Sequence, residues 1–252
     1  MFRVQTELDL IEVAKRNMPR GIARQATLEA LWKFRPAILP SMLMCDFANL
    51  DREIQKLEQA GAQVLHLDVM DGHFVPNFTY GMTIVEAVRK CTSLVVDVHL
   101  MISSPERYVA QFVDSGADCL TFHVEAASDA VALVEKIKQL GVVAGVAINP
   151  STPFSKIDSV AGFADLILVM SVEAGFGGQA FNPLAVDRLR TLRERVRSDV
   201  LLEVDGGISS QTIRVCRDAG ADLFVVGSAI FRHSDYQNAI QDLASACCQT
   251  NV

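Results

Sequence analysis

The sequence lacks several features that would assign it to a specialised class of protein. No apolar run reaches the length of about 20 residues that a membrane-spanning helix needs; runs such as LFVVGSAIF at residues 223–231 are far shorter. The six cysteines form no CxxC pair and follow no secretory signal. Basic residues are outnumbered, with 23 Lys and Arg against 30 Asp and Glu, and form no stripe suited to nucleic acid. We therefore expect a cytoplasmic protein that binds neither membrane nor nucleic acid.

Strands and helices are predicted to alternate along the chain after residue 36. Short apolar runs rich in β-forming residues predict eight strands, at residues 37–43, 64–70, 94–101, 119–124, 142–148, 166–172, 201–207 and 223–229. Segments with helical spacing follow them, at residues 47–61, 81–91, 105–116, 128–141, 153–162, 183–196, 210–220 and 236–245. Four of these segments end at a glycine, as the end of a helix permits: Gly61, Gly116, Gly141 and Gly220.

Eight strand and helix pairs predict an α/β fold, a single-domain (β/α)₈ TIM barrel over residues 37–252. An open, doubly wound sheet is the alternative. No predicted strand is followed by GxGxxG, and this absence weakens the dinucleotide-binding form of that alternative.

The first 36 residues differ from the rest in charge and pattern. They hold seven basic residues and four acidic ones, although the whole chain has a net charge of −7. ELDLIEVAKR at residues 7–16 and ATLEALWKF at residues 26–34 predict short amphipathic helices on either side of a break, NMPRG. The acidic residues Glu7, Asp9 and Glu12 argue against a transit peptide. We expect residues 1–36 to form a helical extension that packs on the barrel or on a partner subunit.

Polar residues stand inside strands that should be buried. His66 and Asp68 are two residues apart and therefore point to the same side of the second strand. His99 lies near the end of the third strand and Asp205 in the seventh. Each residue alone is more simply explained as a satisfied core histidine or a helix cap, but four together at strand ends favour one divalent metal site. Nitrogen and oxygen ligands without thiolate suit Zn²⁺, Fe²⁺, Mn²⁺ or Co²⁺ without choosing among them.

The places of the two aspartates suggest a reaction. In a ring of eight strands, the second and seventh are three intervals apart, so Asp68 and Asp205 should face a central ligand from nearly opposite walls. Two such carboxylates can remove a proton from one face of a carbon and return a proton to the other, which inverts a stereocentre. A metal between them would stabilise the enediolate as a Lewis acid.

Glycines follow three neighbouring strands at the same end of the predicted barrel. GFGGQ at residues 175–179 follows the sixth strand, and the pairs Gly206–Gly207 and Gly227–Ser228 follow the seventh and eighth. Any one of these is more often a tight turn, but three together indicate backbone N–H groups that converge on a phosphate. Met70, Met101 and Met170 lie at the same end, where they fill the core or keep water from the enediolate.

At these residues the sequence closely resembles the ribulose-phosphate 3-epimerase family. The matching segments run, in order, ILPSMLMCDFANL, LHLDVMDGHFVPN, VDVHLM, FHVEA, INPSTP, VMSVEAGFGGQAF, EVDGGI and VGSAIF. They extend from about residue 37 to residue 231. Two positions depart from the family pattern: Ala174 stands where many members have proline, and Cys45 where a smaller or polar residue is usual.

The resemblance implies an isomerase of the pentose phosphate pathway that interconverts D-ribulose 5-phosphate and D-xylulose 5-phosphate with one divalent metal. It implies metal ligands at His66, Asp68, His99 and Asp205, with Asp68 as proton acceptor and Asp205 as proton donor. The substrate-binding residues that it implies are Ser41, His99, Met70, Met101, Met170, Gly175, Phe176, Gly177, Gly178, Asp205, Gly206, Gly207, Gly227 and Ser228. We also expect a homo-oligomer.

Three other functions use related features. A hexulose-6-phosphate 3-epimerase would apply the same chemistry to a longer sugar, and GFGGQ only weakly favours the pentose. Barrel aldolases that form a Schiff base need a lysine at a strand end, and related decarboxylases need an Asp-x-Lys pair on the third strand. Here that strand reads DVH, and all seven lysines fall in the first 36 residues or on predicted helices. A non-catalytic sugar-phosphate sensor would not need two opposed carboxylates.

Overall fold

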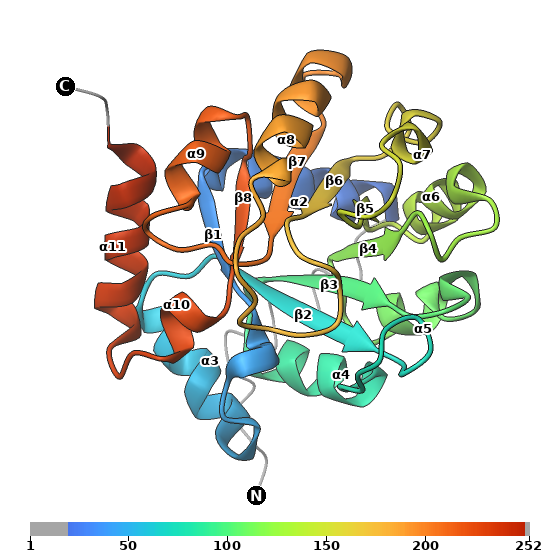
Figure 1. Ribbon diagram of the computed structural model, residues 1–252. Coiled ribbons are helices and arrows are strands. Elements are labelled where there is room, and N and C mark those ends of the chain that lie inside the picture. The colour runs from blue at the N-terminus through green and yellow to red at the C-terminus, as the bar shows by residue number, and fades with distance from the viewer. Residues whose placement is uncertain (1–19, 250–252) are drawn as a thin grey trace, which may run out of the picture.

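The computed structural model describes residues 20–249 of the 252-residue chain, without the side chains of residues 20–22. Eight parallel strands form its centre, and helices surround them (Figure 1). The strands are β1 (Ala37–Pro40), β2 (Val64–Met70), β3 (Val95–Met101), β4 (Cys119–His123), β5 (Val143–Ile148), β6 (Leu166–Met170), β7 (Leu201–Asp205) and β8 (Leu223–Val226).

The strands pair in the order β1-β8-β7-β6-β5-β4-β3-β2. A parallel bridge between Ser41, just after β1, and His66 on β2 joins the two ends of this order. The sheet is therefore a (β/α)₈ TIM barrel, as the alternation predicts.

The α-helices are α2 (Arg20–Phe34), α3 (Leu50–Gln59), α4 (Met82–Cys91), α5 (Val109–Asp114), α6 (Ala130–Gln139), α7 (Ser155–Asp158), α8 (Leu184–Arg195), α9 (Ile213–Asp218), α10 (Ser228–Phe231) and α11 (Tyr236–Cys248). Short 3₁₀ turns lie at η1 (Met42–Met44), η2 (Phe47–Asn49) and η3 (Pro105–Arg107). None of the helices in residues 20–249 has both the length and the apolar character needed to cross a membrane.

All eight predicted strands are found within three residues of their predicted bounds, and β2 agrees at both ends. The first ends at Pro40, because Met42–Met44 turn into a 3₁₀ helix. The helix predicted at residues 153–162 is only the four-residue α7, and α10 was not predicted. The helix predicted at residues 26–34 is longer: α2 is already helical at Arg20, the first described residue, so it includes Arg20 and Gly21 of the predicted break. The helix predicted at residues 7–16 lies outside the described residues.

Helix α2 closes the barrel at the amino ends of the strands. Its Leu31 is 1% exposed and packs in one interior cluster with residues near the starts of the strands, such as Val64, Val95 and Leu223. Arg24 forms an ion pair with Asp165, and Arg35 Nη1 lies 3.0 Å from Asp222 Oδ1. Figure 1 shows this blue helix behind the ring of strands. Because apolar side chains of the described residues fill that end, we look for a ligand site at the carboxyl ends of the strands.

Candidate active site and metal centre

Two adjacent strands place imidazole and carboxylate groups in register at the carboxyl end of the barrel. Asp68 on β2 lies beside His99 on β3, and His66 lies beside Asp97. Because side chains alternate across a strand, these four point to the barrel interior while Leu67 and Val98 pack outward against the helices. On β7, Asp205 is the last residue of the strand and pairs with Met170 of β6.

The four predicted metal ligands come together. One ligand atom from each of His66, Asp68, His99 and Asp205 lies within 4.8 Å of the others. Asp68 Oδ1 is 3.3 Å from His66 Nε2 and 3.2 Å from His99 Nδ1. The buried His66 Nε2 has no hydrogen-bond partner among the described residues. An orphaned buried nitrogen beside two carboxylates fits a divalent cation, and the two-nitrogen, two-oxygen set suits the metals predicted above.

The electrostatics of the histidines also fit a ligand role for His99. Burial lowers the pKa of the His99 imidazole to about 4, with Asp68 opposing the shift. The ring is therefore neutral near pH 7, which is the form that binds a metal. Burial would also lower the pKa of His66, but the charges of Asp68 and Asp97 outweigh it and raise that pKa well above its usual value. Cation binding at His66 must therefore displace a proton.

A second group of buried polar residues lies next to these ligands. His66 Nδ1 is 2.7 Å from Asp97 Oδ2 and 3.3 Å from Glu203 Oε1. The Asp97 bond leaves His66 Nε2 free to face the metal site, the usual arrangement around a ligating histidine. Burial and the neighbouring charge of Asp97 raise the pKa of Glu203 to about 8, so that this carboxyl is largely neutral at pH 7.

The two aspartates have opposite pKa shifts. Burial alone would raise the pKa of Asp68, but His66 and His99 outweigh it and hold that pKa well below its usual range. For Asp205, burial and the negative charge of Asp68 raise the pKa to about 7. An ionised carboxylate and a carboxylic acid thus share one pocket, the combination that a proton acceptor and a proton donor require.

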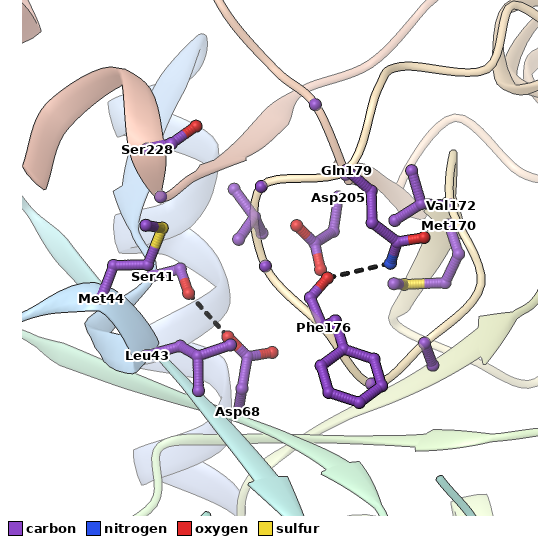
Figure 2. A pocket seen from close by; sticks show the side chains of 18 of the residues that line it. Ser41, Leu43, Met44, Asp68, Met170, Val172, Phe176, Gln179, Asp205 and Ser228 are labelled. Atoms are coloured by element: carbon purple, nitrogen blue, oxygen red, sulfur yellow. Dashed lines mark hydrogen bonds between the residues drawn. The ribbon is translucent and has the colours of Figure 1, made fainter. Parts of the chain in front are cut away.

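A pocket opens above these residues, with Asp68 on one side and Asp205 on the other (Figure 2). Ser41 Oγ donates a hydrogen bond to Asp68 Oδ2 at 2.6 Å, which fixes that carboxylate in the pocket wall. The predicted residues that line the pocket are Ser41, Asp68, Met70, Met101, Met170, Gly175, Phe176, Gly177, Gly178, Asp205, Gly206, Gly207, Gly227 and Ser228. Of the predicted substrate-binding residues, His99 alone is not among the lining residues; it is fully buried.

Backbone glycines rather than cations line the side of the pocket opposite β2. No lysine or arginine belongs to the lining within the described part of the chain. Gly206 and Gly207 have φ values of 106° and 63°, in the left-handed region. A Cβ on Gly207 would lie 2.5 Å from the backbone nitrogen of Phe181, so a larger residue would displace the glycine loop. Bare backbone at such a turn lets N–H groups approach an anion.

Several functional neighbours were missed from the sequence. Asp97 and Glu203 stand two residues before His99 and Asp205, so strand periodicity alone could have identified them as interior. His123, the last residue of β4, was also missed, and its Nε2 lies 2.8 Å from His99 Nε2. Other pocket-lining residues were given no role from the sequence: Leu43, Met44, Val172, Glu173, Ala174, Gln179, Ile208 and Val225. Of these, Gln179 ends the GFGGQ segment and Ala174 precedes it.

Comparisons with known proteins agree on one family. The profile of the ribulose-phosphate 3 epimerase family matches residues 37–231. A ribulose-phosphate 3-epimerase from Bacillus subtilis is 45% identical over 210 residues, which cover 82% of this chain and 97% of the relative. The enzyme of the same name from Escherichia coli K12 is 44% identical over 212 residues, covering 82% and 94%. An orotidine 5'-phosphate decarboxylase from Pyrococcus horikoshii, with a TM-score of 0.62, 15% identity and coverage of 84% and 100%, shares the fold alone.

Proposed function

Since the chain belongs to the ribulose-phosphate 3 epimerase family and is an epimerase, we propose that it interconverts D-ribulose 5-phosphate and D-xylulose 5-phosphate by proton transfer at C3. The observation that carries the proposal is the pair of aspartates that line the pocket, the buried Asp68 on β2 and the half-buried Asp205 on β7, with their opposite pKa shifts. A sugar carbon between them presents one face to a base and the other to an acid.

The proposed reaction starts with Asp68 ionised and Asp205 protonated. Asp68 accepts the proton from C3, and the electron pair of the C–H bond moves onto the adjacent carbonyl to give an enediolate. Asp205 then donates its proton to the opposite face of C3, which inverts the centre. Asp68 ends protonated and Asp205 ionised, so the reverse reaction begins from the product state and solvent exchange resets the pair for the next forward turnover.

Other residues would position the substrate and exclude water. Ser41 donates a hydrogen bond to Asp68 Oδ2. This bond fixes the carboxylate so that its other oxygen, Oδ1, faces His66 and His99. Met70, Met101 and Met170 form the apolar wall of the pocket. We assign the phosphate to the glycine segments at Gly175–Gly178, Gly206–Gly207 and Gly227–Ser228, where backbone N–H groups are the available donors.

We assign a divalent metal to His66, Asp68, His99 and Asp205, supported by the convergence of their ligand atoms and by the orphaned His66 Nε2. When bound, Zn²⁺, Fe²⁺, Mn²⁺ or Co²⁺ would polarise the substrate oxygens next to C3 and stabilise the negative charge that develops there. Each aspartate has two oxygens, so metal binding and proton transfer need not use the same atom.

The decisive experiment is incubation of D-ribulose 5-phosphate with the protein in deuterated water. We expect D-xylulose 5-phosphate that carries one deuterium at C3, because the returned proton comes from a group that exchanges with solvent. Absence of both product and exchange would refute the proposal and favour a sensor. Parallel incubation with a hexulose 6-phosphate measures the preference for the longer sugar.

We also propose that residues 37–252 form the catalytic barrel, that residues 1–36 form an extension to it, and that the protein acts as a cytoplasmic homo-oligomer. Packing of Leu31 into the base of the barrel supports the placement of the second part of the extension. Light scattering of the full chain measures the subunit number, and a monomer at working concentration would contradict the last proposal.

A further inference from the structure

A row of hydrogen-bonded groups extends from His99 on the side of the ring opposite the metal site. It consists of His99, His123 and Glu125. His99 Nε2 lies 2.8 Å from His123 Nε2, and the two rings stack with their centroids 4.9 Å apart. Both histidines are 0% exposed. On the far side of the second ring, His123 Nδ1 lies 3.2 Å from Glu125 Oε2. This row of groups therefore connects the end of β3, the end of β4 and the loop that follows β4.

The chemistry of the contact fixes the order of donors and acceptors. Two imidazole nitrogens 2.8 Å apart share one hydrogen, so one ring must donate and the other accept. Two groups compete for His123 Nδ1: Glu125 Oε2, at 3.2 Å, can only accept, and the Asn149 amide Nδ2, at 3.3 Å, can only donate. A hydrogen bond to an ionised carboxylate is the stronger of the two, so Glu125 favours a hydrogen on His123 Nδ1. A neutral His123 then has a bare Nε2, which accepts from His99 Nε2–H. This tautomer leaves His99 Nδ1 with its lone pair directed toward Asp68 Oδ1 and the metal site.

Glu125 is itself held rigidly. Its Oε1 accepts hydrogen bonds from the backbone N–H of Asn149, at 2.8 Å, and from the hydroxyl of Thr152. Arg188 in turn donates to the carbonyl oxygens of Asn149 and Thr152, both at 2.7 Å. These contacts hold the Glu125 carboxylate in one orientation. Its Oε2 therefore has a fixed position relative to His123 Nδ1.

We propose that His123 and Glu125 are positioning residues that hold His99 in the tautomer and orientation able to bind the divalent cation. The inference rests on the proposed function only in taking His99 as a metal ligand. A carboxylate hydrogen-bonded to a ligating histidine is a common arrangement, and loss of such a partner typically costs about 10- to 100-fold in metal affinity. Here a second histidine stands between the ligand and the carboxylate.

The test measures Co²⁺ affinity by competition with a chromophoric chelator, together with the visible absorption spectrum of the bound Co²⁺. In His123→Phe the ring shape is kept but the acceptor for His99 Nε2–H is lost, so we expect Co²⁺ affinity about 10- to 100-fold below that of the unchanged protein and an altered spectrum. In His123→Gln the amide oxygen can accept the same hydrogen, and affinity should recover to within a few-fold. The Co²⁺ affinity of Glu125→Gln should lie between the affinities of His123→Phe and His123→Gln.

Thr121→Val is the matched control. Thr121 lies on the same strand, two residues before His123, is fully buried, and its hydroxyl has no hydrogen-bond partner among the described residues. Val is nearly the same shape, so Co²⁺ affinity and spectrum should stay unchanged. Unfolding midpoints of all metal-free variants separate weaker binding from a weaker fold.

Wild-type Co²⁺ affinity and spectrum in His123→Phe would overturn the inference, as would equal losses in His123→Phe and Thr121→Val. Failure of the proposed function has a different signature. The unchanged protein would then bind no Co²⁺ at this site, or would bind it and fail to convert the sugar phosphate.

Discussion

At the scale of single residues, Asp205 offers the most direct test of the proposed chemistry. Asparagine keeps its size and a carbonyl oxygen that can still ligate, but it has no proton to donate. We expect Asp205→Asn to lower kcat about 10²- to 10⁴-fold, the usual contribution of a positioned acid. The measurement is the steady-state conversion of D-ribulose 5-phosphate to D-xylulose 5-phosphate.

The same substitution should not weaken the fold. The negative charge of Asp68 opposes ionisation of Asp205, so a neutral amide in place of the Asp205 carboxyl removes an unfavourable interaction. The unfolding midpoint of metal-free Asp205→Asn should equal or exceed that of the unchanged protein. Near-normal turnover in a folded variant would exclude Asp205 as the donor.

Asp71 provides a residue-scale prediction about pH. Its Oδ1 accepts from the backbone N–H groups of His73 and Phe74, and its Oδ2 from the N–H and hydroxyl of Ser103. Burial alone would raise the pKa of Asp71, but these bonds, led by that of Ser103, outweigh it and lower the pKa from 3.8 to about 2. The ionised form thus stabilises the fold above pH 3.8, and this stabilisation declines as the pH falls from 3.8 toward 2.

Asp71→Asn should therefore unfold at a lower denaturant concentration than the unchanged protein at pH 6, and the difference should narrow by pH 3. Asp242→Asn, on the exposed face of α11, is the control and should give a difference that does not change with pH. A difference for Asp71→Asn that stays constant over this range would show that its hydrogen bonds do not depend on the charge.

The site residues that were easiest to predict from sequence are polar residues within strands that are otherwise apolar. His66, Asp68, His99 and Asp205 are polar residues at the ends of apolar strands, and alternation gave the side of the strand on which each lies. The contact of His123 with His99 depends on register between β3 and β4, which pairs His99 with Thr121 and which no local pattern specifies. The bond from Ala174 N–H to Asn149 Oδ1, at 3.0 Å, depends on a loop in the same way.

At the scale of elements, the strands were predictable because both of their faces are buried, which gives continuous apolar runs. The two shortest helices could not be predicted in this way. Helices α7 and α10 have four residues each, too few for a helical period to appear in the sequence. Arg20 and Gly21, predicted to lie in a break, are helical in α2, because glycine lowers helix propensity without excluding a helix.

Helix α2 supplies the element-scale prediction. Leu31 is 1% exposed in the interior cluster at the base of the barrel, so Leu31→Ala should leave a cavity there. We expect a loss of about 2–5 kcal/mol in the free energy of unfolding, measured by denaturant titration. Leu28 is partly buried on the same helix, so Leu28→Ala should lower the free energy of unfolding by a smaller amount. Equal stability of Leu31→Ala and the unchanged protein would show that α2 contributes little to the fold.

At the scale of the whole molecule, the barrel gathers negative charge in its interior, on the carboxyl side of the closed amino end. Asp68, Asp97, Glu203 and Asp205 all lie in the interior, while α2 and its apolar contacts fill the amino end. Buried carboxylates repel one another unless a proton or a cation neutralises them. The raised pKa values of Glu203 and Asp205 are one response to this crowding, and a bound divalent cation would be another.

Removal of metal should therefore change both activity and stability of the full chain. Exhaustive chelation should abolish turnover, and added Mn²⁺, Co²⁺, Zn²⁺ or Fe²⁺ should restore it. At a free metal concentration about 100 times Kd, binding adds about 2.7 kcal/mol to stability, which for a barrel of this size raises Tm by roughly 5–10 °C. His66→Gln, with its ligand nitrogen removed, should show a much smaller rise in Tm at the same metal concentration. Full turnover by protein shown to be free of metal would mean that protons on Glu203 and Asp205 relieve the crowding of carboxylates without a cation, and that the cluster of four ligands serves the fold instead of the chemistry.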